Sequence, residues 1–332
     1  MSAGPAGVLA ALRRAGGRPC SGERLSENQG VSRAQVWKDV QTLRARGYTI
    51  EAVRGEGYRL VAVPDRLYPE EIACGLRTRW LAHTIHHFEQ TDSTNRVALD
   101  LAREGAPHGT AVVAEAQTAG RGRLGRSFFS PAGANLYTSL VLRPEITTDA
   151  APAFILASAV AVAETVAAFV DEPGAVEIKW PNDVLIEGLK TCGILMELSA
   201  EANRVAWLVL GIGVNLNFDP ARFPEEFRRT ATSLCAHRSG PVERVPFARR
   251  LYENLETTLE ICEREGLTGV LPRFETRFRM RGRSVRVRDL DGGTRVGTVA
   301  GIANDGALLL VREGGDPERI LAGDVTLEKE SA

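Results

Sequence analysis

Arginine and glycine alternate in one short segment of this 332-residue chain, a pattern suited to binding an anion. The segment AQTAGRGRLGRSFFS fills positions 116–130 and places three arginines among three glycines between 120 and 126. Glycine lets backbone amides converge on an anion, and arginine neutralises its charge. The segment is not a Walker A loop, because no Gly-Lys-Ser/Thr follows, and no strand-and-helix setting supports a dinucleotide fingerprint. Taken alone, a segment of this type is more often a solvated loop.

Lysine is rare in the chain, and its positions point to two further motifs. Only four lysines stand against 37 arginines. Two of the four, Lys179 and Lys190, fall in the segments KWPND (179–183) and LKTCGIL (189–195). A lysine ammonium is a compact, rotatable charge, whereas a guanidinium is a planar fork. These positions therefore indicate sites that need a point charge.

Two polar or glycine-bearing segments complete the set, TDSTN at 91–95 and GIGVNLN at 211–217. Each of these motifs has an ordinary structural explanation when taken alone. Asp-Ser-Thr-Asn before an apolar helical pattern is typical of a helix cap. WPND is compatible with a turn, and glycines in a buried strand permit close packing.

The elements before these motifs predict a winged helix-turn-helix. GVLAALRR and SGERLSEN read as two helices, and SRAQVWKDVQTLRARG reads as a third, opened by a capping box of Ser32 and Gln35. YTIEAVRGEGYRLVA then predicts a hairpin. Residues 1–64 hold ten Lys or Arg against five Asp or Glu, a net charge near +5, although the whole chain carries −1. A basic surface of this kind suits a polyanion such as DNA, but a small helical domain with a solvated charged face remains the alternative.

The remainder divides into a central and a small terminal part. VPDRLYPEE is the expected linker, and beyond residue 281 short alternating strands separated by Asp-Gly and Gly-Gly turns predict a small β-barrel. We therefore expect domains at 1–64, 67–280 and 281–332. The apolar stretch 150–170 includes Pro152 and Glu164, and its charge-free part is too short to span a bilayer, so we expect a buried helix with Asp149 near its cap.

Composition excludes several classes of protein. With 44% hydrophobic residues the chain can bury a core, and its five cysteines form no C-x-x-C pair, which argues against a zinc site or a disulfide framework. No signal-peptide pattern opens the sequence, so we expect a cytoplasmic protein with no membrane partner. His83, His86 and His87 have helical metal-ligand spacing, but a strand is expected there, and surface histidines are the better interpretation.

In this order and spacing, the motifs DSTN, AQTAGRGRLGR, KWPND, LKTCGIL and GIGVN resemble the catalytic domain of biotin-protein ligases. With the winged helix and the terminal barrel, the chain is similar across almost its entire length to the bifunctional type, the biotin operon repressors. The resemblance implies an α+β fold: an N-terminal winged helix-turn-helix, a central mixed-sheet domain of the class II synthetase-like biotin and lipoate ligase type, and a small Src-homology-type β-barrel at the C-terminus.

The reaction implied by this resemblance has two steps. Biotin and MgATP give biotinyl-5'-adenylate and pyrophosphate, and a lysine of a biotin carboxyl carrier protein then attacks the mixed anhydride. The implied catalytic residues are Lys190, which would bridge the biotin carboxylate and the α-phosphate, and Arg123. The implied biotin-binding residues are Ser93, Thr94, Asn95, Gln117, Gly120, Arg121, Gly122, Arg123, Lys190 and Gly193.

The implied nucleotide site is lined by charged and polar residues, with Asp183 also a candidate Mg²⁺ ligand. One position departs from the family pattern, because Ser127 and Phe128 stand where a tryptophan near the adenine is usual. Phenylalanine can still stack on a base but lacks the indole donor. The implied ATP-binding residues are Arg123, Arg126, Phe128, Lys179, Asn182, Asp183, Lys190 and Asn215.

The resemblance also implies operator DNA as a partner and a homodimer when the adenylate is bound. Two alternatives stay open: a lipoate-protein ligase, and a biotin-sensing DNA-binding regulator without ligase activity. The expected DNA contacts are Ser32, Arg33, Gln35, Lys38 and Arg54.

Overall fold

The structure is a computed structural model that describes residues 4–288, 293–312 and 315–327. The chain divides into two compact units, Met1–Arg66 and Leu67–Ala332. The first three residues of the expected N-terminal domain and the last five of the expected C-terminal domain lie outside the described residues.

The first unit is a winged helix-turn-helix, as its sequence predicts. Helices α1 (Pro5–Arg14), α2 (Gly22–Gln29) and α3 (Arg33–Ala45) precede an antiparallel hairpin of β1 (Thr49–Val53) and β2 (Gly57–Ala62). Ser32 caps α3 by accepting a hydrogen bond from the Gln35 N–H at 3.2 Å. The reciprocal half of the capping box is not formed, because the Gln35 side chain donates to Asp39 at 2.9 Å. The core of the unit includes Val8, Leu9, Leu12, Leu25, Val36, Val40 and Leu43.

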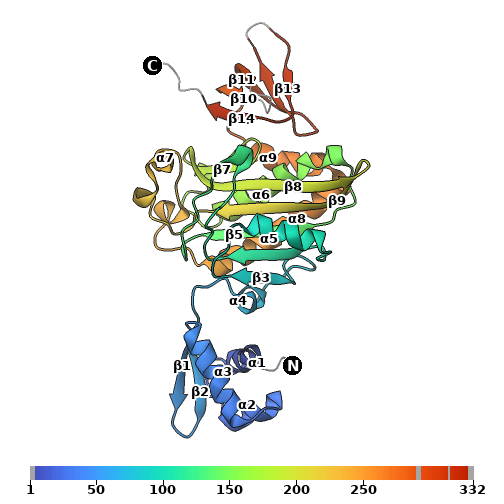
Figure 1. Ribbon diagram of the computed structural model, residues 1–332. Coiled ribbons are helices and arrows are strands. Elements are labelled where there is room, and N and C mark those ends of the chain that lie inside the picture. Colours follow the sequence, from blue (N-terminus) through green and yellow to red (C-terminus); the bar gives the residue numbers. More distant parts are fainter. Residues whose placement is uncertain (1–3, 289–292, 313–314, 328–332) are drawn as a thin grey trace. The chain divides into compact units, whose positions relative to one another are not determined.

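A seven-stranded mixed sheet forms the centre of the second unit (Figure 1). Its order is β3-β4-β5-β9-β8-β7-β6, and only β3 and β4 run parallel. The strands are β3 (Ile85–Phe88), β4 (Thr110–Ala114), β5 (Leu136–Leu142), β6 (Val176–Lys179), β7 (Asp183–Ile186), β8 (Leu189–Glu201) and β9 (Arg204–Val214).

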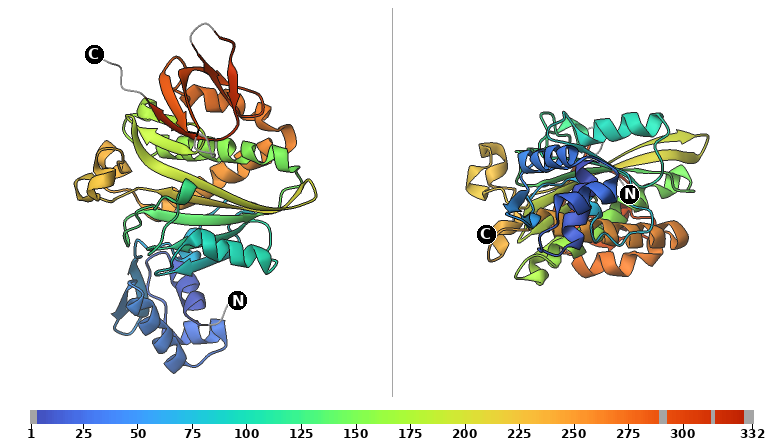
Figure 2. Two further views of the ribbon diagram at one scale, coloured as in Figure 1. Left: turned by 45° about the horizontal axis from the view of Figure 1, so that its top comes forward. Right: turned by 90° about the horizontal axis from the view of Figure 1, so that it is seen from below.

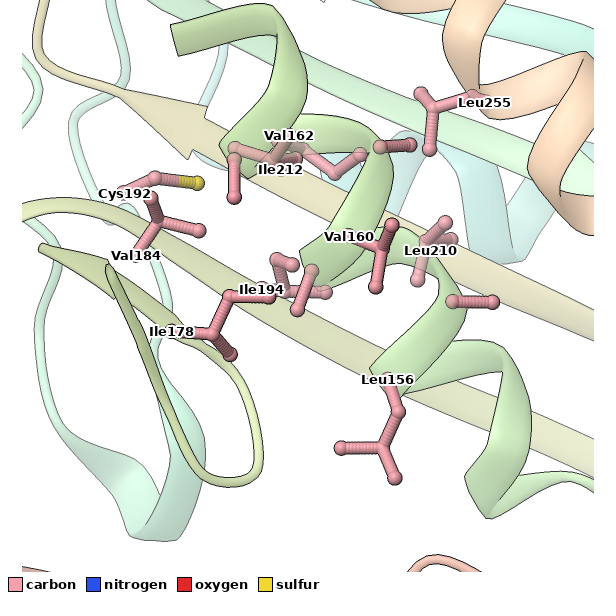
Figure 3. Packing of buried hydrophobic residues seen from close by; sticks show 14 of the residues in the cluster. Leu156, Val160, Val162, Ile178, Val184, Cys192, Ile194, Leu210, Ile212 and Leu255 are labelled. Carbon is pink, nitrogen blue, oxygen red and sulfur yellow. The ribbon is translucent and has the colours of Figure 1, made fainter. Parts of the chain in front are cut away.

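Helices cover both faces of this sheet because its strands alternate two apolar sets of side chains. On one face, α5 (Thr94–Arg103) packs on Val112, Val141 and Val209. On the other, α6 (Pro152–Ala167) and α8 (Arg244–Glu265) pack on residues of the opposite parity, such as Ile194, Leu210 and Ile212 (Figure 3). Three shorter helices complete the unit: α4 (Pro69–Ala73), α7 (Glu225–Arg228) and α9 (Leu271–Arg277).

The apolar stretch of the sequence is a core helix. Residues Thr148–Ala167 are long and apolar enough to cross a membrane by length and composition alone, but 78% of the window is buried inside the protein. Asp149 lies near the cap as expected: it belongs to the 3₁₀ turn Thr148–Ala150, and Ala151, the N-cap of α6, follows directly. Pro152, in the first turn of α6, has no N–H to satisfy there.

The C-terminal strands curl but do not close into the expected barrel among the described residues. They are β10 (Ser284–Arg288), β11 (Thr294–Ile302), β12 (Leu308–Val311), β13 (Glu318–Ile320) and β14 (Asp324–Leu327), in the order β13-β12-β11-β10-β14. A flat sheet would hold β13 and β14 about 19 Å apart, whereas the four steps from Ile320 to Asp324 reach at most about 14 Å. The short connection therefore requires a curled sheet (Figure 2), but it crosses from one edge to the other without forming a β13–β14 ladder.

A buried ion pair ties distant parts of the second unit together. Arg244, at the start of α8, donates to Glu115 just after β4 at 2.8 Å, and both side chains are 1% exposed. The other Glu115 oxygen accepts the N–H of Leu67 at 2.9 Å and lies 3.6 Å from His87 Nε2. The prediction of surface histidines is therefore wrong for His87, because the alternation of β3 turns its ring inward toward Glu115.

The protonation of Glu115 should make folding sensitive to acid. Burial alone would raise the pKa of Glu115, but the nearby His87 ring, the Arg244 charge and the Leu67 N–H together lower it from 4.5 to about 2. A carboxyl group whose pKa falls on folding stabilises the native state above its unfolded pKa, so this stabilisation should be lost as the pH falls from about 5 to about 2.

We therefore expect Glu115→Gln to lower the free energy of unfolding near pH 7 by about 3–5 kcal/mol, because it removes one charge of a buried ion pair. Urea unfolding midpoints measured from pH 2 to pH 7 should fall less steeply with acid in Glu115→Gln than in the wild type. Parallel curves for the two proteins would contradict this role.

Candidate active site

A polar pocket and a wide cleft meet on the face of the central sheet that carries α5. The polar pocket, about 50 Å³ in volume, lies over β8 and β9. The wide cleft, about 650 Å³, extends beside it to α7 and to the C-terminal strand β14. The polar pocket and the wide cleft share Gly122, Arg123, Phe128, Asn182 and Lys190.

The floor of the polar pocket is made of glycines that leave room for other side chains. Gly193 of β8 and Gly213 of β9 face each other, and Gly211 follows on the same side of β9. A Cβ atom at Gly211 would lie 1.9 Å from Asn95 Oδ1, and one at Gly213 would lie 2.6 Å from the Phe128 ring. Neither glycine has a positive φ, so space and not backbone conformation requires them.

A β-bulge at Thr191 turns Lys190 toward the pocket. Val184 of β7 pairs with Cys192, but the next residue, Leu185, pairs with Lys190, so β8 carries one extra residue. In a regular strand of the same residues, Lys190 would share the face of Cys192, which is buried in the core. The extra residue places the lysine over Gly193, with its ammonium 2.6 Å from Asp183 Oδ1.

Hydrogen bonds hold the polar side chains of the pocket in fixed orientations. The N–H and hydroxyl of Thr94 both donate to Gln117 Oε1, at 2.8 and 3.1 Å, and Gln117 Nε2 donates to Ser130 at 2.9 Å. The Ser139 hydroxyl lies 2.9 Å from Thr94 Oγ1 and 2.7 Å from Asn95 Oδ1. The result is a rigid set of donors and acceptors suited to a neutral polar ligand.

The Gly-Arg segment forms a small hairpin over the pocket. The Gly122 N–H donates to Arg126 O at 2.7 Å, and Leu124 and Gly125 turn the chain with φ values of 56° and 73°. Arg121 forms an ion pair with Glu197 at 3.3 Å.

The other two arginines of the segment reach the C-terminal strands. Arg123 donates to Asn182 Oδ1 at 2.9 Å and to Gly323 O at 3.2 Å, and Arg126 forms an ion pair with Asp324. A Cβ at Gly122 would make only ordinary contact with the returning chain, 3.4 Å from Arg126 O. The C-terminal strands are thus part of the site.

The wide cleft combines cationic and aromatic walls. Arg126, Lys179 and Lys190 line it, as do Phe223 and Phe227. The wall around α7 is attached to β8, because Lys190 N–H donates to Thr230 O at 2.8 Å and Thr232 N–H donates to Lys190 O at 2.9 Å. A cleft of this kind can accept a planar ring at one end and phosphates at the other.

Most of the residues that the sequence singled out lie around the polar pocket and the wide cleft. No group of three His, Cys, Asp or Glu side chains suited to a metal ion occurs among residues 4–288, 293–312 and 315–327, so Asp183 does not belong to such a cluster. The polar pocket is lined by Ser93, Thr94, Asn95, Gln117, Arg121, Gly122, Arg123, Phe128, Asn182, Lys190 and Gly193, and the wide cleft by Gly122, Arg123, Arg126, Phe128, Lys179, Asn182, Asp183, Lys190 and Asn215.

One of the expected residues does not line either cavity, and two others that do have additional local contacts. Gly120 is not among the residues that line the pocket; a Cβ there would lie 2.4 Å from Phe128 O, so it packs behind the hairpin. The Asn215 side chain donates to Thr232 O at 3.1 Å and braces the cleft wall. The Phe128 ring rests on Gly213 and lines both cavities, so it is not confined to the nucleotide side.

The expected DNA contacts all lie in the first unit, but two of them have local partners as well. Ser32 caps α3, and the Gln35 side chain donates to Asp39. Arg44, also off the apolar stripe of α3, donates to Ile50 O at 2.6 Å and fastens the helix to the hairpin. The remaining expected contacts are exposed: Arg33 and Lys38 on α3, and Arg54 at the tip between β1 and β2.

Three residues of the polar pocket or its rim were not found from the sequence. Tyr137 lines the pocket, the Ser139 hydroxyl contacts Thr94 and Asn95, and Glu197 contacts Asn95 and Arg121. Ser139 could have been noticed in the sequence, because it is a polar residue inside the mostly apolar run 136–142. Glu197 has the same parity as Gly193 and Leu195 on β8, which was the signal for its face.

Comparisons with known proteins match three separate segments of the chain. The model of the "Biotin/lipoate A/B protein ligase family" matches residues 87–215, that of an "HTH domain" residues 8–59, and that of the "Biotin protein ligase C terminal domain" residues 282–327.

Individual relatives and solved structures agree with these matches. The chain is 38% identical to the bifunctional ligase/repressor BirA of Bacillus subtilis, over 96% of this chain and 97% of that protein. It is 35% identical to the BirA of Escherichia coli, over 89% and 88%. The structure of a biotin protein ligase from Aquifex aeolicus in complex with biotin and ATP superposes with a TM-score of 0.64 at 27% identity, over 75% of this chain and 100% of that chain.

The glycine floor makes a prediction about stability. Gly211→Ala should lower the free energy of unfolding by about 1–3 kcal/mol, the usual cost of overpacking, because the new methyl group would collide with the buried Asn95 side chain. Gly174→Ala is the matched control, since no atom lies within 4 Å of a Cβ there. Chemical denaturation of both variants and the wild type measures the effect, and equal stability of the two variants would contradict the tight contact at Gly211.

Proposed function

The chain belongs to the family of bifunctional biotin-protein ligase/repressors, and on that premise we propose that it joins biotin to a biotin carboxyl carrier protein at the expense of ATP. One observation carries the proposal. Lys190, turned by the bulge at Thr191, stands where the polar pocket meets the wide cleft. An ammonium at this boundary suits a reaction that joins a ligand in one cavity to a ligand in the other.

The polar pocket suits the biotin ring system. A ureido ring is neutral and needs donors and acceptors in fixed positions, and the network of Thr94, Gln117 and Ser139 offers both. The pocket is smaller than the roughly 300 Å³ at which ligand pockets usually begin. The Phe128 ring, which rests on Gly213, therefore moves when biotin enters.

The wide cleft suits ATP. Arg123, Arg126 and Lys179 supply positive charge for phosphates, and Phe128, Phe223 and Phe227 supply apolar surface for an adenine. Mg²⁺ enters with the nucleotide as part of the substrate. Asp183 fits one inner ligand of that ion, because Mg²⁺ bound to phosphates takes only one or two protein carboxylates.

The chemistry follows from the placement of Lys190. A biotin carboxylate oxygen attacks the α-phosphorus of ATP, the bond to pyrophosphate breaks, and biotinyl-5'-adenylate forms. Two anions must approach each other for this step, and the ammonium offsets their repulsion and stabilises the charge that builds up. Arg123 supports the same charge from the hairpin side. The amine of the acceptor lysine then attacks the biotinyl carbonyl carbon, and AMP leaves.

The winged helix-turn-helix supports a second activity in the cytoplasm, the biotin-responsive repression of transcription through binding to operator DNA. One recognition helix neutralises few phosphates, so a single unit with a net charge near +5 should bind DNA weakly. Two units held in a homodimer would bind an inverted repeat through a higher effective concentration. If the adenylate promotes that dimer, biotin and ATP act as corepressors by linkage, and the carrier protein opposes them by consuming the adenylate.

The ligase proposal is tested by incubating the full-length protein with labelled biotin or labelled lipoate, with ATP and a carrier domain. Transfer of biotin alone is expected. Transfer of lipoate alone would indicate a lipoate ligase, and binding of biotin without transfer would indicate a regulator without ligase activity.

In the same assay Lys190→Arg should bind biotin yet release pyrophosphate at least about tenfold more slowly. The planar guanidinium keeps the charge but cannot occupy the same point between carboxylate and phosphate. Arg264→Lys, an exposed conservative change at the end of α8, is the control and should match the wild type. If Lys190→Arg stays within about threefold of the wild type, a difference of about 0.7 kcal/mol, the role of Lys190 is refuted.

The repressor proposal predicts that DNA affinity depends on the ligands present. Three gel-shift titrations at fixed salt test it: with the protein alone, with biotin and ATP added, and with biotin, ATP and carrier domain added. Affinity for an inverted repeat near biotin-related genes should rise when biotin and ATP are added, and should fall again when carrier domain follows. Equal binding in all three titrations would mean that the DNA-binding unit is not switched by the ligase reaction.

A further inference from the structure

Glu197 joins the floor of the polar pocket to the hairpin above it. The residue lies on β8, on the same side of the strand as Gly193 and Leu195. Its Oε2 atom accepts a hydrogen bond from Asn95 Nδ2 at 2.9 Å, and its Oε1 atom lies 3.3 Å from Arg121 Nη2. The Glu197 side chain is 27% exposed.

The three arginines of the Gly-Arg hairpin face different cavities. Arg121 lines only the polar pocket, Arg126 lines only the wide cleft, and Arg123 lines both. Arg123 and Arg126 can therefore reach phosphates in the wide cleft. Arg121 stands instead beside Asn95 at the end of the pocket that suits a neutral ring. A neutral ring cannot balance the charge of Arg121, and Glu197 supplies the counter-charge from the protein.

The same carboxylate fixes the orientation of Asn95. The Oδ1 atom of Asn95 lies 2.7 Å from the Ser139 hydroxyl, and its Nδ2 atom donates to Glu197. An amide that points its oxygen at a hydroxyl and its nitrogen at a carboxylate does not flip, because the flipped amide would set oxygen against oxygen at Glu197. Asn95 sits directly over Gly211, so its plane is also held by packing.

We propose that Glu197 is a positioning residue that holds the Arg121 end of the Gly-Arg hairpin over the polar pocket and so sets the rate at which biotin escapes. The inference rests on the proposed function, because it assigns biotin to this pocket. The ion pair of Arg121 and Glu197, which we call the latch, lies at the end of the pocket that suits the biotin ring. Nucleotide binding depends on the other end of the hairpin, so the latch acts on biotin and not on ATP.

The test measures dissociation of tritiated biotin from the full-length protein during a chase with unlabelled biotin. Glu197→Gln keeps the size of the side chain and an acceptor for Asn95 but removes the charge. It should release biotin about two- to fivefold faster, the range expected for a partly exposed ion pair, while the KM for ATP stays within about twofold of the wild type. Arg121→Gln should have a similar effect, and the double variant should be no faster than the faster single variant, because both changes break one contact.

The matched control is Asp100→Asn, which breaks an ion pair with Arg103 on the exposed face of α5 and should leave the dissociation rate unchanged. A wild-type rate for Glu197→Gln, an equal rise in the KM for ATP, or additive effects in the double variant would each overturn the latch. Failure of the wild type to form biotinyl-5'-adenylate would instead refute the proposed ligase function, and the chase would still measure the latch on any biotin that binds.

Discussion

The rest of the site depends on one constraint, the close approach of other side chains to the glycines of β8 and β9. Gly193, Gly211 and Gly213 leave the centre of a well-packed sheet without side chains on one face, whereas the residues between them fill the core on the other. Asn95 and Phe128 occupy the space so released. The missing side chains on this face of the sheet thereby leave room for polar groups to lie within contact distance of a ligand.

The arginines of the hairpin are held by the protein itself. Three like charges in so short a segment would repel one another if they had no partners, but each has a polar contact in the structure: Arg121 with Glu197, Arg123 with Asn182 and Gly323, and Arg126 with Asp324. Any phosphate that binds Arg126 must therefore compete with Asp324. This competition favours a ligand with more than one negative charge, as a triphosphate has.

Local patterns predicted much of the fold and of the site, but contacts between residues far apart in the sequence could not be predicted from them. The helices, the hairpin of the first unit and the polar motifs around Thr94, Gln117 and Lys190 follow from caps, periodicity and motif order. The ion pair between Glu115 and Arg244 joins residues 129 positions apart, and no local pattern encodes it.

The contact between Arg126 and Asp324 spans 198 positions, which is why the C-terminal strands were expected as a separate barrel and not as part of the site. The bulge at Thr191 was hidden for a related reason, since it depends on how β7 and β8 pair and not on the residues of β8 alone. Ser139 and Glu197 were missed because their neighbours in space come from other strands and helices.

The bulge at Thr191 also bears on how such a sequence can change over time. A substitution at a regular strand position alters one side chain, but a change that abolished the bulge while keeping every residue of β8 would restore regular alternation and direct the lysine into the core beside Cys192. The pairing of β7 with β8 at these positions is therefore subject to selection in addition to the identity of the lysine. Substitutions that shift this pairing should be excluded even where they leave Lys190 unchanged.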